Sequence, residues 1–73
     1  MTDVRAQTAF ANILLAHIRR DRYPSVTHMQ VLESIIPPSM VREYLDVLLE
    51  KVMIDRFPSI PMLKRIARIV QQA

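Results

Sequence analysis

Apolar side chains recur every three or four residues along most of the chain, which is the spacing of one face of an α-helix. The pattern runs through four segments, at about 4–20, 26–36, 40–54 and 60–71. Period-two alternation, typical of a half-buried strand, never lasts for a strand's length. We therefore expect an all-α fold with four helices.

The residues that step by three and four are expected to face a core. In the first and third segments they are Phe10, Ile13, Leu14, His17 and Ile18, and Tyr44, Val47, Leu48, Lys51 and Val52. In the second and fourth segments they are Val26, Met29, Leu32, Ile35 and Ile36, and Ile60, Leu63, Ile66, Ile69 and Val70.

The two halves of the chain resemble each other. Residues 10–36 align with residues 44–70 at a shift of 34 positions without a gap. The block Asp-Arg-[Tyr/Phe]-Pro-Ser-[Val/Ile] recurs in both halves, in register with the flanking apolar positions. This repeat predicts two duplicated helical hairpins, at about 4–36 and 40–71, that build a single domain with an approximate internal twofold.

The recurring block has the composition of a turn between helices. The serines are placed to cap the following helices, and the prolines to end the preceding ones. Because the chain has no glycine, we expect the aspartates to close the first helices in left-handed backbone geometry and the aromatic residues to lie in the core. These turn residues are Asp21, Tyr23, Pro24 and Ser25, and Asp55, Phe57, Pro58 and Ser59. Between the hairpins, Pro37 and Pro38 are expected to end the second helix and Ser39 to cap the third.

Composition excludes many kinds of site. A chain of 73 residues builds one small core. The missing glycines remove phosphate-binding loops, dinucleotide fingerprints and calcium loops, which need positive-φ backbone. The missing cysteines remove disulfides, zinc fingers, iron–sulfur clusters and thiol nucleophiles. Most enzyme classes are therefore poor candidates.

The histidines offer little chemistry by sequence alone. His17 and Asp21 have a spacing that can hold a metal, but two ligands are too few and no third is apparent. Ser25 lies three residues before His28, yet its hydroxyl is expected to act as a helix cap. We expect no catalytic, cofactor or metal site, and we expect His17 to lie partly buried or at the core boundary.

Apolar residues exceed what so small a domain can bury, at 51% of the chain. Contiguous exposed apolar surface marks an interface. The alternative is that close helix packing hides the Leu-Leu pairs of the two hairpins. The interface candidates are Leu15, Val31, Met40, Leu49, Met53, Ile54 and Met62.

The charged residues form two groups, within a formal net charge of +3. Glu43, Asp46 and Glu50 make an acidic stripe, expected as a solvated face with some ion pairing or as a partner-docking surface. Basic residues gather at the first turn and on the fourth helix, where they complement helix ends or bind phosphates or an acidic protein. These patch candidates are Arg19, Arg20, Arg22, Lys64, Arg65 and Arg68.

The sequence favours a non-enzymatic protein–protein interaction module, either a homodimer or a small adaptor that uses an apolar helix face. The alternative is a small nucleic-acid-binding regulator that uses the arginine-rich patch. Neither a signal peptide nor an apolar run of about 18 residues is visible. We therefore expect a cytoplasmic protein without a membrane partner.

Overall fold

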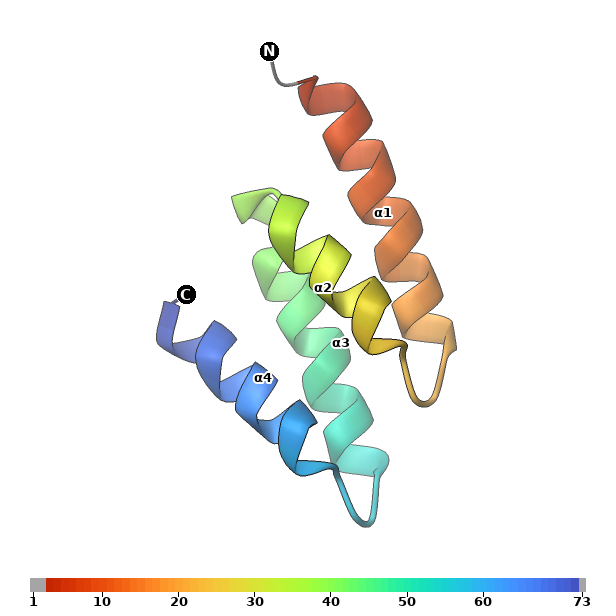
Figure 1. The fold of residues 1–73 in the computed structure, drawn as a ribbon, viewed down its shortest axis with the longest axis vertical. Helices are drawn as coiled ribbons and strands as arrows, with labels where there is room; N and C mark the ends of the chain where they lie inside the picture. Colours follow the sequence, from red (N-terminus) through yellow and green to blue (C-terminus); the bar gives the residue numbers. More distant parts are fainter. Residues whose placement is uncertain (1–2, 73) are drawn as a thin grey trace. The chain divides into compact units, whose positions relative to one another are not determined.

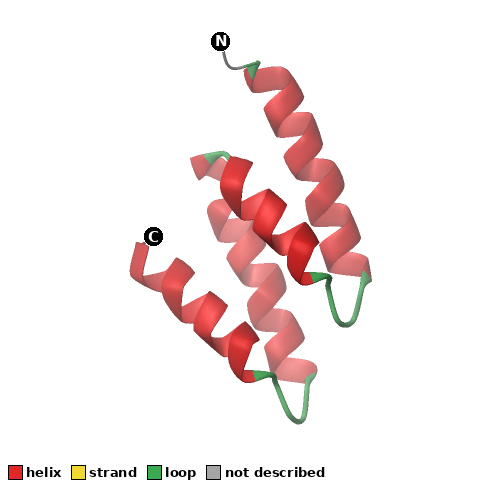
Figure 2. Cartoon of the chain, viewed as in Figure 1, coloured by secondary structure: helices red, strands yellow, loops and turns green. Residues whose placement is uncertain are grey.

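The computed structural model describes residues 3–72, and every regular element in that range is helical. The elements are α1 (Val4–Arg20), α2 (Val26–Ile35), a short 3₁₀ helix η1 (Pro38–Met40), α3 (Val41–Ile54) and α4 (Ile60–Gln72) (Figures 1 and 2). The all-α expectation is confirmed, and each α-helix ends within one residue of its predicted bounds.

The helices group into two compact units, one ending at Met40 and the other beginning at Val41. In the first unit α1 packs against α2, and in the second α3 packs against α4. Each pair is an antiparallel hairpin whose helices are joined by a short turn (Figure 1). The border between the units falls where the proline pair predicts the break between hairpins. That the hairpins are duplicates, and that they build one domain with an internal twofold, stays a prediction.

Polar side chains cap three of the helix starts. Asp3 Oδ1 accepts a hydrogen bond of 3.0 Å from the backbone N–H of Ala6. Ser25 Oγ accepts from the backbone N–H of His28 at 3.3 Å, and Ser59 Oγ accepts from that of Met62 at 3.2 Å. Each cap satisfies an amide that has no partner within its helix. Both predicted serine caps are confirmed.

The first helix of each hairpin ends in a different way from the one expected. Asp21 has φ −82° and ψ 126°, which is extended backbone, and no residue between 3 and 72 has a positive φ. The expectation of left-handed aspartates is therefore wrong. Left-handed geometry costs a residue with a Cβ roughly 1–2 kcal/mol, whereas extended geometry costs nothing comparable. The Asp21 N–H still bonds the His17 carbonyl at 3.2 Å.

The break between the hairpins is a 3₁₀ turn. The backbone N–H of Met40 donates to the carbonyl oxygen of Pro37 at 2.9 Å. Ser39 lies inside this turn, and Met40 is the residue directly before α3. The expected Ser39 cap is therefore wrong, because the chain enters α3 from helical rather than extended geometry.

The buried faces agree with the predicted ones in part. Leu14, Ile18, Met29, Leu32, Tyr44, Val47, Leu48 and Ile66 are buried as expected. The face of α1 differs, because Ala11 and Leu15 are buried while Phe10 and Ile13 are exposed. The exposed residues that we expected in the core also include Val26, Ile60, Leu63 and Val70. Periodicity locates an apolar arc on a helix, but it does not say which part of a broad arc is covered.

Candidate interaction surfaces

A group of exposed apolar side chains lies in the turn between α3 and α4 and at the two helix ends beside it. Met53, Phe57 and Ile54 are 84%, 81% and 67% exposed, and Ile60, which begins α4, is 64% exposed. We call these four residues the apolar turn surface. Isolated exposed apolar residues are ordinary on proteins, but four large ones within eight positions are not.

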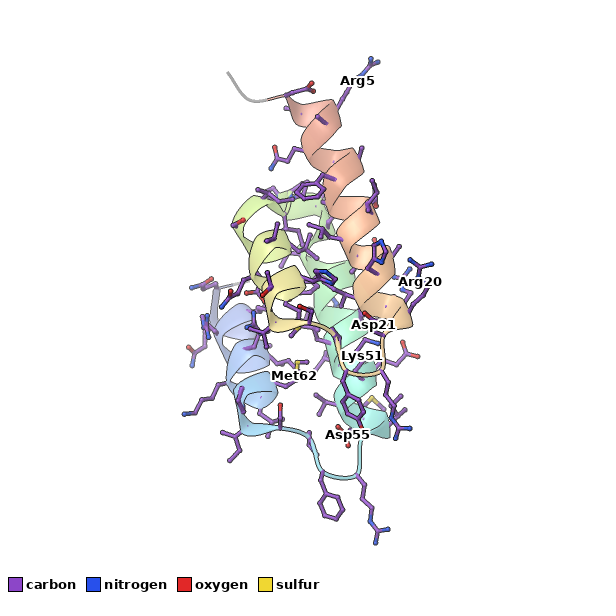
Figure 3. All side chains as sticks on the ribbon, turned by 45° about the vertical axis from the view of Figure 1, so that its right-hand side comes forward. Arg5, Arg20, Asp21, Lys51, Asp55 and Met62 are labelled. Carbon is purple, nitrogen blue, oxygen red and sulfur yellow. The ribbon has the colours of Figure 1, made fainter. Side chains whose placement is uncertain are left out.

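The backbone of this turn satisfies its own polar groups. The Asp55 N–H donates to the Val52 carbonyl at 3.3 Å, and Asp55 Oδ1 accepts from the Phe57 N–H at 3.1 Å. Figure 3 places Asp55 at the end of α3, where the turn begins. The Arg56 guanidinium carbon lies 5.6 Å from the centroid of the Phe57 ring. The turn is therefore held by local bonds that leave its large side chains in solvent.

The turn between α1 and α2 has the same framework. A serine caps its second helix in the same way, and the Arg22 guanidinium carbon also lies 5.6 Å from the centroid of the following aromatic ring, that of Tyr23. Tyr23 is 70% exposed. The expectation that Tyr23 and Phe57 lie in the core is therefore wrong. The ring of each packs against its neighbouring arginine, and Pro24 takes the buried position in the first turn.

The two turns present different chemistry on this common framework. At the 34-residue shift, Arg19 and Arg20 correspond to Met53 and Ile54, and all four side chains are exposed. We call Arg19, Arg20 and Arg22 the basic turn surface. The first hairpin thus offers cations where the second offers apolar groups.

The predicted basic patch needs one correction on α4. Lys64 and Arg68 are exposed there, but Arg65 is only 9% exposed. Its position, three residues after Met62 and one before Ile66, puts it on the buried face of the helix. The arginines of the basic turn surface belong to the first unit, and Lys64 and Arg68 belong to the second.

An apolar face continues from the apolar turn surface along α4. Leu63, Ala67 and Val70 follow Ile60 at helical spacing, and all are exposed. We call these three residues the α4 apolar face. Lys64 and Arg68 lie beside it in sequence and are exposed as well. The apolar residues of α4 on this side of the helix are therefore exposed to solvent.

The predicted interface residues divide by burial. Met53 and Ile54 are exposed, while Val31, Leu49 and Met62 are half-buried. Leu15 and Met40 are 2% and 7% exposed, which corrects the expectation that they contribute to an exposed apolar surface. For Leu15 the alternative of close packing holds.

The acidic stripe of α3 is exposed at Glu43, Asp46 and Glu50, as expected. Arg42 Nε lies 3.1 Å from Asp46 Oδ1, and both side chains are more than half exposed. An exposed pair of this kind contributes about 0.3–0.5 kcal/mol to a helix. The stripe is thus a solvated charged surface in the second unit, the same unit that carries Lys64 and Arg68.

The two histidines lie together, which the sequence did not suggest. The ring centroids of His17 and His28 are 6.2 Å apart, with the ring planes at 53°. His17 Nδ1 lies 3.2 Å from an Arg20 nitrogen, and both histidines are exposed. The expectation that His17 is partly buried or at the core boundary is wrong, because the covered face of α1 is centred on Ala11 and Ile18.

Among residues 3–72, no group of three or more histidine, aspartate and glutamate side chains could hold a metal ion. In the same range, the helices are too short or too polar to cross a bilayer. Comparison of the chain with family models, with curated proteins and with solved structures finds no match.

Proposed function

We propose that this chain acts by associating with another protein molecule, through the apolar turn surface and the adjoining α4 apolar face. The observation that carries the proposal is the exposure of Met53, Ile54, Phe57 and Ile60, each more than 60% exposed, at the end of α3, in the turn and at the start of α4. Burying such side chains in a contact is favourable at about 25 cal/mol per Å² of apolar surface removed from water. Aromatic residues and methionine are also enriched at the centres of interfaces.

The proposed partner is a second copy of the chain. The second unit carries cations beside its α4 apolar face, at Lys64 and Arg68, and anions on α3, at Glu43, Asp46 and Glu50. Opposite charges on two helices of one unit can pair with their counterparts in a second copy across a twofold axis, where each contact occurs twice. The apolar groups would form the centre of this interface and the charges its rim.

The test is the dependence of mass on concentration, measured by sedimentation velocity on the full chain. We expect the wild type to shift from monomer toward dimer as concentration rises, and Phe57→Glu to remain monomeric. Tyr23→Glu is the matched control, because Tyr23 holds the equivalent place in the first turn. A wild type that stays monomeric into the high micromolar range contradicts self-association, and so does equal weakening by both substitutions.

Charge reversal identifies the rim. A chain with Lys64→Glu and Arg68→Glu has two acidic faces, and a chain with Glu43→Lys and Glu50→Lys has two basic ones. We expect each variant alone to dimerise less than the wild type because like charges meet, and an equal mixture to recover a heterodimer. A mixture that associates no better than its components would exclude these residues from the interface.

The basic turn surface supports a second candidate function, binding to single-stranded nucleic acid. Its three arginines are exposed, and Arg22 lies against the exposed Tyr23 ring. Arginines pair with phosphates, and an exposed aromatic ring stacks a base. Fluorescence anisotropy of a mixed-sequence oligonucleotide tests it. We expect binding at low salt that falls steeply as salt rises. Arg19→Ala plus Arg22→Ala should abolish this binding, and Arg5→Ala should leave it unchanged. Absence of binding at low salt removes this candidate.

A further inference from the structure

The histidine pair is built from two helices of one hairpin. His17 comes from the last turns of α1 and His28 from the first turn of α2, and both belong to the first unit. Their side chains are exposed, so solvent and small ions reach both rings. The equivalent positions of the second hairpin hold Lys51 and Met62, so the pair has no counterpart there (Figure 3).

The spacing of the rings matches that of two ligands on one ion. A zinc–nitrogen bond is about 2.0–2.1 Å, so the ion lies roughly 3 Å from each ring centroid, and two rings on one ion have centroids roughly 4.5–6.5 Å apart. The observed separation of 6.2 Å lies within that range. We propose that His17 and His28 form a two-histidine site for a divalent transition metal ion.

The class of metal follows from the ligands. Neutral imidazole suits zinc, copper and nickel, and the affinity of a nitrogen site rises along the first-row divalent ions to a maximum at Cu²⁺. No third histidine or carboxylate completes the site within residues 3–72. Water fills the other positions, so the site is an open one that exchanges its ion, unlike a four-ligand structural zinc site.

Arg20 opposes the metal in two ways. A guanidinium only donates, so a hydrogen bond across the contact of 3.2 Å needs the His17 tautomer whose Nδ1 is unprotonated and whose Nε2 carries the proton. A metal bound at Nε2 takes the place of that proton, and the neutral ring then carries its proton on Nδ1, where it no longer accepts from Arg20. The arginine charge also repels a cation. Removing Arg20 should therefore strengthen binding, and the loss of affinity in His17→Gln then shows that His17 itself is a ligand.

Metal binding would join the end of α1 to the start of α2. The ion would bind the folded hairpin better than the unfolded chain, because only the folded hairpin holds the rings together. Such preferential binding raises the melting temperature in proportion to the logarithm of metal concentration once the site is saturated. Lower pH weakens the effect, since protons compete for the ring nitrogens.

The test is titration of the full chain with CuCl₂ and, separately, ZnCl₂ near neutral pH. Calorimetry gives stoichiometry and affinity, and electron paramagnetic resonance of the copper form counts its nitrogen ligands. We expect one Cu²⁺ per chain with two imidazole nitrogens, and at least a tenfold loss of affinity in His17→Gln and in His28→Gln. We expect Arg20→Ala to bind more tightly and the matched Arg5→Ala to bind as the wild type does.

The double variant His17→Gln plus His28→Gln sets the background from all other groups, and its circular dichroism checks that the helices remain. The exposure of both rings favours an intact fold. Copper or zinc should raise the melting temperature of the wild type and leave that of the double variant unchanged. Affinity equal to that of the wild type in His28→Gln, or in the double variant, overturns the site.

Discussion

The side-chain amide of Gln7 donates a hydrogen bond of 2.6 Å to the backbone carbonyl oxygen of Ile35, 28 residues further along the chain. Gln7 is the fourth residue of α1 and Ile35 is the last residue of α2. The final carbonyls of a helix have no partner within it, so this bond satisfies one of them. It also joins the two ends of the first hairpin that lie opposite its turn.

This relationship predicts the cost of Gln7→Ala. The substitution leaves the Ile35 carbonyl without this partner in a part-buried place, which should lower the free energy of unfolding by about 1 kcal/mol. Gln30→Ala, at an exposed position of α2, is the matched control and should change stability little. Urea denaturation followed by circular dichroism measures both. Equal effects of the two substitutions would show that the bond adds nothing.

Each serine cap should contribute about as much to the free energy of unfolding as the Gln7 bond does. Ser25→Ala and Ser59→Ala each remove the oxygen that accepts from an amide of the following helix, at a cost of about 1 kcal/mol in the free energy of unfolding. Ser25→Asp should keep most of the stability, because aspartate caps as well as serine does and its charge suits a helix start. Thermal or urea unfolding of the three variants checks this. A Ser25→Asp variant no more stable than Ser25→Ala contradicts the cap.

The covered face of α1 can be mapped with one type of substitution. Ala11 is fully buried and Ala16, on the same helix, is exposed. Ala11→Leu should destabilise the protein by about 1–3 kcal/mol, because the extra atoms have no room. Ala16→Leu should have little effect on the free energy of unfolding. A larger loss of stability in Ala16→Leu than in Ala11→Leu would show that the covered face of α1 is instead the one centred on Phe10 and Ile13, which periodicity favours.

The exposed aromatic rings should matter little for folding. Tyr23→Ala removes a ring in solvent and its contact with Arg22, which is worth about 0.5–1 kcal/mol at an exposed site. Leu32→Ala, at a fully buried position of the same hairpin, should cost about 2–5 kcal/mol. Urea denaturation measures both variants. Similar losses in the free energy of unfolding for Tyr23→Ala and Leu32→Ala would show that the Tyr23 ring lies in the core.

The proposed duplication can be tested through the proposed metal site. Lys51→His plus Met62→His, introduced into the His17→Gln plus His28→Gln chain, moves the histidine pair to the equivalent positions of the second hairpin. Matching hairpins should recover copper binding with two imidazole ligands. Superposition of residues 10–36 on 44–70 in an experimental structure tests the same claim without the metal. Hairpins that differ in helix spacing or turn geometry in that superposition would contradict the duplication.

Periodicity and turn chemistry were enough to predict the helices. The caps at Ser25 and Ser59 and the prolines before them act over a few residues, so their effect can be seen in a short stretch of sequence. The same local rules failed at Asp21, where extended backbone offered a helix end that needs no glycine. The first and last residues of a helix depend on nearby sequence, and for α1, α2, α3 and α4 they were predicted to within one residue.

Burial and site geometry depend on what packs on each helix, and there prediction was weaker. Leu15 is buried and Ile13 exposed, although both are large and apolar, because the side of α1 that is covered is a tertiary property. The approach of His17 and His28 depends on how two helices cross, which spacing along one helix cannot show. The Tyr23 and Phe57 rings were misplaced because an apolar ring beside a helix break suggests burial, whereas stacking on an adjacent arginine keeps each in solvent.

The shared framework of the two turns has a consequence for how this chain can change. Its caps and arginine–aromatic contacts use a few fixed positions. Arg19 and Arg20 at the end of α1, and Met53 and Ile54 at the end of α3, are exposed and take no part in those caps. Substitutions at these four places can therefore alter recognition at little expense in folding. The residues at the turn end of either hairpin can therefore be changed separately, by evolution or by design, while the two helices of that hairpin stay the same.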